Sequence, residues 1–314
     1  MGYNPAKPYK RQILGAIEET WNTPHIQVRR GVYPAFRKKF SGWEVDHTDG
    51  IGTKGYYHWR LGTFREAVID ALAMNLNDLA LVRATPYKLS NHITVPVEDE
   101  RVYRVVREVV RECSKREIAV VGGENSFHNT AEGLDISMTI SGLLHGKPTP
   151  NAFHIGDTLV GLKSSGLHSN GFTTVRRVFG KIVRKEFTRP TAVYLNTILA
   201  LDKRFNIHGM MHITGGAFTK LKDVLGARAD AHIAHPRALT PHPIFYELRE
   251  RGKFSNKVMY STFNCGIGFI LSVPPRDAER IVHCTRGAAI IGSVKNGGGK
   301  VHVLSAFSNK TTVL

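Results

Sequence analysis

The sequence predicts an α/β (α+β) chain in two parts, because stretches of helical and strand periodicity alternate along it. The 314 residues correspond to one large or two medium domains, and 42% of them are hydrophobic, which is enough to form packed cores. A proline-containing segment, residues 147–151, is expected to link a domain over residues 1–150 to a domain over residues 151–314.

In the first part, helices are expected over residues 9–21, 64–82 and 98–116, and strands over residues 43–48, 83–96, 118–121 and 134–144. The helix over residues 98–116 has the clearest pattern, because its valines fall on one face and its arginines on the other. In the second part, strands are expected over residues 158–162, 288–292 and 300–304, and another opens within residues 262–269. A helix is expected from near Phe172 and another over residues 277–284, and the glycines of residues 296–299 predict a hairpin turn between the last two strands.

The chain carries 43 Lys and Arg residues against 26 Asp and Glu residues, a formal net charge of +17. Such an excess is compatible with solvated basic faces, with steering of anionic small molecules, or with nucleic-acid binding. The basic residues are spread along the chain and aromatic residues do not interleave with them. Nucleic-acid binding is therefore the least favoured of these three explanations of the charge.

Three cysteines, Cys113, Cys265 and Cys284, lie far apart and form no CxxC pair. This spacing argues against zinc and disulfide frameworks, and favours a reducing, cytoplasmic compartment. No run of about 18 apolar residues is present, so no transmembrane helix is expected. The first eight residues lack the apolar core of a signal peptide, and Ala6 stands where a myristoylation motif has Ser or Thr.

Residues 45–54 (VDHTDGIGTK) predict a strand that ends in a carboxylate, then a glycine turn, a hydroxyl and a lysine. Carboxylates such as that of Asp49 bind Mg²⁺ through oxygen, and Gly50 and Gly52 allow the backbone to approach a ligand closely. Lys54 offers a positive charge to phosphate. The stretch is therefore a candidate nucleotide–metal site, although an ordinary Asp-Gly turn has the same pattern.

Three polar residues interrupt the apolar stripe of the helix over residues 64–82. Asp70 and Asn77 are seven residues apart and share a face, whereas Asp78 lies about 100° further round. Polar groups among apolar neighbours are destabilising unless they are bonded. These side chains therefore either form a metal or substrate site or make capping contacts.

Polar residues also follow several strands. Gly122 and Gly123 predict a sharp loop that places Glu124 at the end of the strand over residues 118–121, with Asn129 nearby; a solvated acidic loop is the alternative. Residues 163–171 (KSSGLHSNG) lead into a helix N-terminus, where free backbone N–H groups bind anions. His168 in this loop is either solvated or functional. Residues 212–218 repeat the order of strand end, glycine pair and helix.

Common nucleotide and nucleophile motifs are missing from the sequence. It contains no GxxxxGK[ST] loop, no GxGxxG after a strand and no GxSxG elbow. A nucleotide site in this chain must therefore have another form.

Six motifs, taken in order, resemble the phosphoribosylformylglycinamidine cyclo-ligase family, the AIR synthetases of purine biosynthesis. They are residues 48–54 (TDGIGTK), 69–78 (IDALAMNLND), 121–124 (VGGE), 164–171 (SSGLHSNG), 212–216 (HITGG) and 262–268 (TFNCGIG). The resemblance extends from about Val45 to Val303, and six motifs in register are far more specific than any one of them.

The resemblance implies a two-domain fold, with an N-terminal mixed sheet that forms an intersubunit barrel in a homodimer and a C-terminal α/β sandwich. It implies an ATP-dependent enzyme that uses Mg²⁺, and possibly K⁺. The implied reaction closes formylglycinamidine ribonucleotide (FGAM) to 5-aminoimidazole ribonucleotide (AIR) and releases ADP and phosphate. FGAM, ATP and a second copy of the chain are then its partners.

The resemblance also implies roles for individual residues. Metal ligands are expected at Asp49, Asp78 and Glu124. Nucleotide contacts are expected at Asp49, Gly50, Gly52, Thr53, Lys54, Asp70, Asn77, Gly123 and Glu124. Substrate contacts are expected at Ser164, Ser165, Gly166, His168, Ser169, Asn170, Gly171, Thr214, Gly215 and Gly216. Catalytic roles are expected for Asp78, for Lys54 on a phosphate, and for His168 in proton transfer or orientation.

Two other readings stay open. The run from Ser126 to Asn129 looks more like that of the related FGAM synthetases, so another ATP-using member of the superfamily is an alternative. Such members include thiamine monophosphate kinases and hydrogenase-maturation enzymes. A non-catalytic relative that binds nucleotide or RNA is a third hypothesis, because the chain is so basic.

Overall fold

The computed structural model describes residues 8–31 and 33–314, which form two compact units. One unit runs up to Leu79 and includes Ala84–Lys147; the other comprises Ala80–Arg83 and Pro148–Leu314. The signal-peptide and myristoylation expectations fall on the first residues of the chain, of which residues 1–7 lie outside the described part. Within the described part, no helix is both long and apolar enough to cross a membrane.

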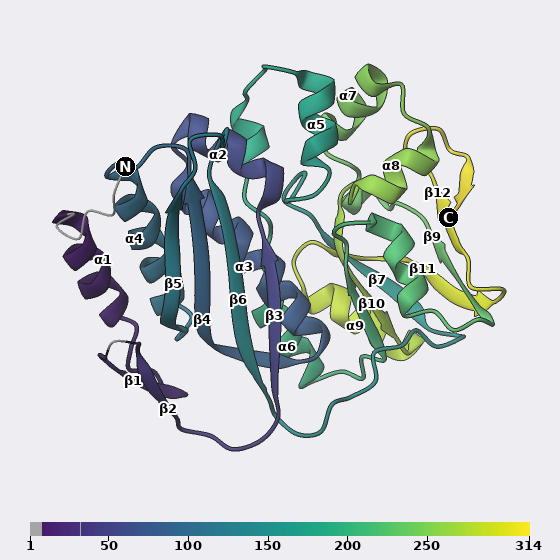
Figure 1. Ribbon diagram of the computed structural model, residues 1–314. Coiled ribbons are helices and arrows are strands. Elements are labelled where there is room, and N and C mark those ends of the chain that lie inside the picture. The colour runs from purple at the N-terminus through teal and green to yellow at the C-terminus, as the bar shows by residue number, and fades with distance from the viewer. Residues whose placement is uncertain (1–7, 32) are drawn as a thin grey trace. The chain divides into compact units, whose positions relative to one another are not determined.

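The N-terminal unit is built on a mixed four-stranded sheet in the order β3-β6-β4-β5. Its strands are β3 (Glu44–Gly50), β6 (Asp135–Leu144), β4 (Ala84–Val95) and β5 (Ala119–Phe127). The β3–β6 and β6–β4 pairs are antiparallel, and β4 and β5 are parallel. Figure 1 shows helices α3 (Phe64–Leu81) and α4 (Arg101–Ser114) on one face of this sheet. The unit also contains α1 (Pro8–Glu18), η1 (Gly52–Lys54), α2 (Gly55–Leu61) and the ribbon of β1 (Ile26–Arg29) and β2 (Ala35–Lys38).

The C-terminal unit is built on a seven-stranded sheet in the order β13-β12-β9-β11-β7-β10-β8. Its strands are β7 (Thr158–Lys163), β8 (Gly209–His212), β9 (Ala229–Ile233), β10 (Ile267–Val273), β11 (Ala288–Asn296), β12 (Val301–Leu304) and β13 (Thr311–Val313). Its α-helices are α5 (Phe172–Phe179), α6 (Leu195–Asp202), α7 (Pro243–Gly252), α8 (Asn256–Thr262) and α9 (Pro275–Cys284). Short 3₁₀ helices lie at η2 (Lys185–Thr188), η3 (Ala217–Asp223) and η4 (Arg237–Leu239). Only the β12–β9 pair is parallel among these strands.

The predicted mixed α/β architecture is confirmed in both units, and two local expectations are wrong. The strand predicted to end at Val121 continues as β5 to Phe127, with Gly123 aligned to Asn91 and Glu124 aligned to His92. A Cβ atom at residue 123 would lie 2.6 Å from the Asn91 carbonyl oxygen, so the glycine serves close strand approach rather than a turn. Gly122 and Gly123 therefore do not open a loop.

The second error concerns the glycines after β11. A hairpin was expected between the last two predicted strands, but β9 lies between β11 and β12. β11 pairs antiparallel with β9, whereas β12 pairs parallel with it. Residues 297–299 thus carry the chain past β9, so that β11 and β12 each pair with β9 instead of with each other.

Thr20 and Trp21, which follow α1, anchor this part of the chain to β5 through their side chains. The indole N–H of Trp21 donates to the Val120 carbonyl at 2.9 Å, and the Val120 N–H donates to the Thr20 hydroxyl at 2.9 Å. Around this anchor lies an apolar cluster that includes Ile26, Tyr87 and Leu143. The N-terminal segment therefore extends the core of its own unit.

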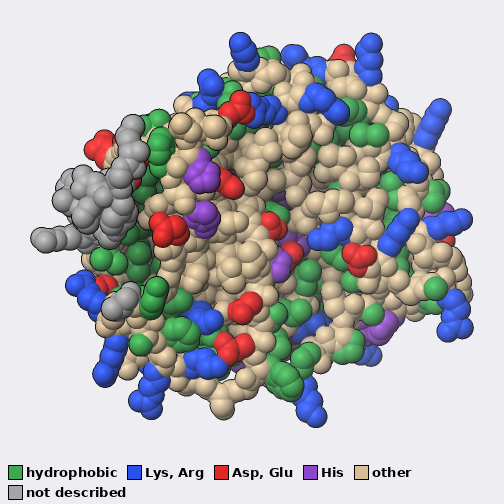
Figure 2. Space-filling view, viewed as in Figure 1, with side chains coloured by type: hydrophobic (Ala, Val, Ile, Leu, Met, Phe, Trp, Pro, Cys, Tyr) green, Lys and Arg blue, Asp and Glu red, His purple; other side chains and the backbone are tan. Residues whose placement is uncertain are grey.

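On the face of the molecule seen in Figure 2, the basic side chains are dispersed. Figure 2 shows Lys and Arg spread singly over the visible face, with no continuous basic patch. Several are neutralised locally; for example, Arg184 pairs with Glu247 at 2.7 Å and Arg107 with Glu19 at 2.6 Å. This distribution differs from the clustered basic stripe that is typical of a nucleic-acid-binding face.

Truncation of the core of α3 tests the packing of the N-terminal unit. Leu72 is fully buried, so Leu72→Ala is expected to lower the free energy of unfolding by about 2–5 kcal/mol. All three tryptophans (Trp21, Trp43 and Trp59) belong to this unit, so tryptophan fluorescence in a urea titration reports its unfolding selectively. The control, Leu61→Ala, truncates a side chain that is 37% exposed and should change stability by less than about 0.5 kcal/mol. Equal effects of the two variants would contradict this packing.

Candidate functional site

The turn after β3 begins as the sequence suggests. The Asp49 carboxylate accepts the Gly50 N–H at 2.7 Å, and the Ile51 N–H donates to the Ile136 carbonyl at 3.1 Å. Gly52 has φ 51°, a left-handed conformation that favours glycine, and begins η1. The turn is thus held against β6 while it directs the chain toward α2.

A buried ionic trio lies directly after this turn. Lys54, at the end of η1, donates to both carboxylate oxygens of Asp70 on α3, at 2.9 and 2.7 Å. The His58 ring, on α2, donates through Nε2 to Asp70 at 2.8 Å and accepts the Thr63 hydroxyl through Nδ1 at 2.8 Å. All three members of the trio are 0% exposed. The expected contact of Lys54 with a phosphate does not fit this position, because the amine is enclosed and bonded to Asp70.

The protonation states of the trio follow from burial and pairing. Burial alone would raise the pKa of Asp70, but the Lys54 charge and the His58 hydrogen bond outweigh it and hold this pKa well below its usual range. Burial lowers the pKa of His58, so its ring is neutral at pH 7. Burial also lowers the pKa of Lys54, against the attraction of Asp70. The trio is thus an ion pair braced by a neutral imidazole.

A second polar group links β3 to α3. The His47 ring contacts Asn75 through Nδ1 at 3.0 Å and Asp78 through Nε2 at 3.3 Å. The Asn75 amide also donates to the Asp49 carbonyl at 3.1 Å. The hydrogen bond to Asp78 is the main cause that raises the pKa of His47. Asp49 and Asp78 are therefore brought to one region, with His47 between them.

The other predicted site residues of α3, Asn77 and Asp78, differ in their burial. Asn77 is fully buried, like Asp70, so the face that the two were predicted to share is an interior face. Asp78 is only partly buried, with 16% of its side chain exposed. Of the acidic residues of this helix region, Asp78 is thus the one placed to meet a ligand.

Glu124 does not join Asp49 and Asp78 within one chain. β3 and β5 form opposite edges of the sheet, so they are separated by three strand spacings, roughly 14 Å. Glu124 shares its cross-strand row with His92 and Ser137, whose side chains are exposed, whereas Asp49 shares a row with the buried Met138. The three predicted metal ligands therefore do not form one cluster in a single copy of the chain.

In the C-terminal unit, two predicted loops follow strands whose carboxyl ends lie at the same end of the sheet. β7 and β8 are both antiparallel to β10, which lies between them, so their carboxyl ends point the same way. Residues 164–171 follow β7, and residues 213–216 follow β8. A Cβ atom on Gly215 would lie 3.9 Å from the Asn170 amide oxygen. The structure thus brings together the substrate-binding residues predicted in these two loops.

His168 holds the first loop from inside. Its side chain is fully buried, its backbone has φ 61°, and its Nε2 accepts the Ser165 N–H at 3.1 Å. A Cβ atom on Gly268 would meet the His168 ring at 2.6 Å, so the glycine of β10 makes room for the imidazole. His168 is therefore an orienting group of this loop, because its Nε2 is already bonded to the loop backbone.

Other side chains fix the remaining backbone of the loop. Asn264 donates to the Gly166 carbonyl at 2.9 Å and to the Leu167 carbonyl at 3.2 Å. The Ser165 hydroxyl donates to the Pro190 carbonyl at 2.6 Å, and the Ser169 and Thr191 hydroxyls are 3.0 Å apart. Gly171 has φ 73° and is the N-cap of α5. The loop is thus rigid before any ligand binds.

The Ser164 hydroxyl and the Asn170 amide nitrogen are buried atoms of the loop that have no hydrogen-bond partner among the described residues. Buried polar groups are rarely left unpaired unless a ligand or water completes them. In the second loop, Gly216 has φ 78°, and the Lys220 amine donates to the Thr214 hydroxyl at 3.1 Å. A hydroxyl, an amide and an ammonium group suit a polar, anionic ligand.

Sequence reasoning missed several residues of these networks. His47, Asn75 and His58 had no assigned role, although His47 directly precedes the first motif, Asn75 lies inside the second and His58 is four residues after Lys54. Lys220, Arg189 and Asn264 were also missed; Arg189 donates to the Ser165 carbonyl at 3.2 Å. The spacing of Lys54 and His58, four residues apart before a helical aspartate, was a signal for the trio.

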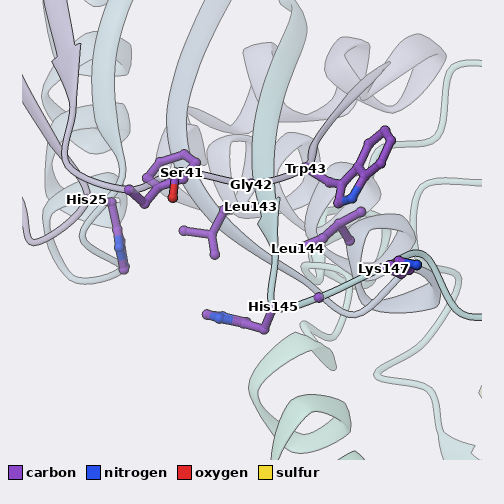
Figure 3. A pocket seen from close by; sticks show the side chains of 10 residues that line it. His25, Ser41, Gly42, Trp43, Leu143, Leu144, His145 and Lys147 are labelled. Carbon is purple, nitrogen blue, oxygen red and sulfur yellow. The ribbon is translucent and has the colours of Figure 1, made fainter.

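A hollow of about 540 Å³ in the N-terminal unit lies apart from these residues. It is lined by the segment just before β3, which includes Trp43, by the end of β6 and the residues that follow it, which include His145 and Lys147, and by His25. Figure 3 shows His25, Leu143 and His145 on one side of it and Trp43 with Leu144 on the other. None of the predicted site residues lines it, so this hollow does not mark the predicted nucleotide site.

The two units and their loops define a two-domain α/β protein of the AIR synthase type. The family model described as AIR synthase related protein, N-terminal domain, matches residues 41–144, and the model of the C-terminal domain matches residues 154–304. Together these matches cover more than half of the chain. The chain therefore belongs to the family of AIR synthase related proteins.

Curated relatives carry a more specific name. A phosphoribosylformylglycinamidine cyclo-ligase of Methanococcus maripaludis is 32% identical over 85% of this chain and 84% of its own length. The protein of the same name from Saccharolobus solfataricus is 31% identical over 81% of this chain and 79% of its own length. The family resemblance in the six sequence motifs is thereby confirmed.

Solved structures share the fold at low sequence identity. The hydrogenase maturation protein HypE in complex with ATP has a TM-score of 0.71 and is 17% identical, with coverage of 99% of this chain and 95% of that chain. The thiamine-monophosphate kinase of Stenotrophomonas maltophilia has a TM-score of 0.65 and is 16% identical, with coverage of 95% and 96%. These likenesses concern the two-domain architecture alone.

Removal of the Asp70 charge tests the buried trio. Asp70→Asn leaves the Lys54 ammonium enclosed without its counter-charge, so the free energy of unfolding is expected to fall by about 3–5 kcal/mol at pH 7. A carboxylate with a lowered folded pKa stabilises the fold above its unfolded pKa, so the difference between variant and wild type should shrink below about pH 4. Urea titrations followed by tryptophan fluorescence at several pH values measure both effects.

The control variant, Asp99→Asn, removes a partly exposed partner of Arg101 and should change stability by less than about 1 kcal/mol. A loss for Asp70→Asn no larger than that of the control would contradict the buried ion pair.

Proposed function

We propose that this protein is an ATP-dependent ligase that closes the ring of FGAM to form AIR in purine biosynthesis. The observation that carries the proposal is the family match across both units, with relatives of that name about one-third identical over most of both chains. The polar, rigid loops of the C-terminal unit support it further, because they suit a phosphorylated substrate.

The substrate contacts are assigned to the two loops at the carboxyl ends of β7 and β8. The unpaired Ser164 hydroxyl and Asn170 amide nitrogen would bond polar atoms of FGAM. The N–H groups at the start of α5 and the Lys220 ammonium group would hold its phosphate. Thr214, Gly215 and Gly216 would form the opposite wall. His168 holds the backbone conformation of residues 165–171 and acts as a positioning residue.

The nucleotide contacts are assigned to the N-terminal unit. ATP supplies the phosphoryl group that turns the amide oxygen of FGAM into a leaving group. Asp49 and Asp78 would hold its Mg²⁺, because both carboxylates lie close enough to the His47 ring to raise its pKa, and carboxylate oxygens are preferred Mg²⁺ ligands. The turn formed by Gly50, Gly52 and Thr53 would approach the phosphates, and K⁺ could assist there.

Lys54, Asp70 and Asn77 have a different role in this proposal. They are buried, so they would position the turn and α3 rather than touch the nucleotide. Glu124, beside Gly123, lies on the far edge strand and would reach the metal only from a second copy of the chain. The polar open face of the sheet supports such a dimer, since Asp46, Thr48 and Thr139 would line the interior of a barrel formed with the partner sheet.

The compartment and partners follow from the same argument. We place the enzyme in the reducing cytoplasm, where its three free cysteines stay reduced. FGAM, ATP and a second copy of the chain are the proposed partners. Nucleic acid is the less favoured partner, because the basic side chains on the visible face are dispersed rather than clustered.

A direct assay tests this proposal. Purified protein with FGAM, ATP and Mg²⁺ is expected to form AIR, ADP and phosphate in equal amounts, and a blank without FGAM should release little ADP. Turnover of ATP with thiamine monophosphate or another small substrate, but none with FGAM, would replace this function by that of another superfamily member. Salt-sensitive RNA binding without ATP turnover would replace it by a binding function.

One substitution tests the metal assignment within the assay. Asp78→Asn is expected to lower kcat by about 100-fold or more, because a metal ligand is lost while the core stays packed. Size-exclusion chromatography should give the same elution volume as for wild type. Asp99→Asn, which alters a surface ion pair, should leave kcat unchanged. Full activity of Asp78→Asn would remove Asp78 from the site.

A further inference from the structure

Two histidines of the C-terminal unit lie face to face on adjacent strands. His232 on β9 and His302 on β12 are direct partners in the parallel register of these strands. Their rings are stacked, with centroids 4.5 Å apart and an angle of 4° between planes. This separation is close to the spacing of neighbouring strands, so the backbone itself sets the two imidazoles side by side.

An aspartate completes the group. Asp230 is two residues before His232 on β9, so its side chain points to the same face of the sheet. One carboxylate oxygen lies 3.0 Å from Nε2 of His302. One possible ligand atom from each of Asp230, His232 and His302 lies within 4.8 Å of the other two.

The glycine-rich turn of residues 297–299 holds this carboxylate. The other oxygen of Asp230 accepts the N–H groups of Gly298 at 2.8 Å and Lys300 at 2.7 Å. A Cβ atom on Gly297 would lie 2.0 Å from the carboxylate carbon, so only glycine permits this approach. The turn thus acts as an outer support that fixes one oxygen and leaves the second directed toward the histidines.

Both histidine rings have nitrogen atoms that are available to bind a ligand. Among the described residues, His232 has no hydrogen-bond partner, and His302 uses only Nε2. Both rings line a hollow of about 240 Å³ whose wall also includes Ser293 and Thr311. An ion bound by the two rings would therefore have coordination positions left open toward this hollow.

We propose that Asp230, His232 and His302 form a binding site for a divalent transition-metal ion, with Zn²⁺ as the best match. Two imidazole nitrogens and one carboxylate oxygen, with an open fourth position, suit tetrahedral zinc. Ligand bonds of about 2.0–2.1 Å place neighbouring ligand atoms about 3.4 Å apart, so the two rings must tilt out of their parallel stack about Cβ–Cγ until both ring planes pass through the ion. The site uses none of the residues assigned to FGAM or ATP, so it is independent of the proposed ligase function.

A second histidine–aspartate group in the same unit provides the comparison. His154, Asp157 and His208 also lie within reach of one ion. There, however, Asp157 accepts bonds from the His208 ring, the Ser272 hydroxyl at 2.6 Å and the His154 N–H at 3.2 Å. The His208 ring is bonded on its other nitrogen by Asn206 at 2.9 Å. The Asp157 carboxylate and the His208 ring are thus satisfied by protein partners, and His154 of this group serves as the matched control.

Zinc binding by the full chain tests the proposal. Untagged protein, treated with a chelator and then dialysed, is titrated with ZnCl₂ by isothermal calorimetry. A stoichiometry of about one zinc per chain is expected, and Zn²⁺ should raise the melting temperature. His232→Ala and His302→Ala should each weaken binding by about tenfold or more. His154→Ala should bind zinc like wild type.

Two further readouts keep the result interpretable. His232→Gln retains a polar side chain of similar size, and its unchanged melting temperature without zinc would show that weaker binding is not a folding defect. Co²⁺ in place of Zn²⁺ should give the intense visible absorption of a tetrahedral site in wild type and lose it in His232→Gln. Absence of zinc binding, or zinc binding that is lost in His154→Ala and kept in His232→Ala, would overturn the proposal.

Discussion

The buried contact between Lys54, His58 and Asp70 is the constraint on which the N-terminal unit depends. It joins the 3₁₀ turn after β3, the short helix α2 and the long helix α3 through side chains that are fully enclosed. Charges are stable inside a protein only when their partners stay in place, so the trio holds the turn at residues 50–54 in one position relative to α3. Asp49 enters that turn and Asp78 is two turns further along α3, so the spacing of these two carboxylates follows from the trio. In the proposed ligase, Lys54 would therefore serve phosphate binding indirectly, by holding the turn that would meet the phosphate.

The sheet that carries this turn is incomplete at both edges. β3 and β5 each have one unpaired side among the described strands, and the face opposite α3 and α4 is polar. Exposed strand edges are usually covered or paired, and a second copy of the sheet would do both while enclosing the polar face. The same closure would bring Glu124 to a site that it cannot reach within its own chain. In the proposed ligase, the carboxylates of one metal site would therefore come from two copies of the chain.

The sequence predicted most of the framework because its signals were local. The helix over α3, the valine face of α4 and the loop at residues 164–171 each follow from periodicity or from residues adjacent in the chain. The features that the sequence did not predict depend on pairing between segments that are distant along the chain. The continuation of β5 through Gly122 and Gly123 depends on the close approach of β4, and the glycines after Asn296 serve Asp230, some 70 positions earlier in the chain. Likewise, the burial of Lys54 could not be read from a motif in which lysine usually meets phosphate, because Asp70 reaches it only after α3 has packed.

The central claim is that one metal–ATP site combines Asp49 of one copy with Glu124 of another. The most direct measurement is AIR formation by a dimer in which one chain carries Asp49→Asn and its partner carries Glu124→Gln, obtained by co-expression with two tags and purified over both. Each variant alone should be inactive. In the mixed dimer one of the two sites regains both carboxylates, so about half of the wild-type activity per dimer is predicted from two-fold symmetry. A mixed dimer that is as inactive as its parents, or a fully active Glu124→Gln homodimer, would contradict the account.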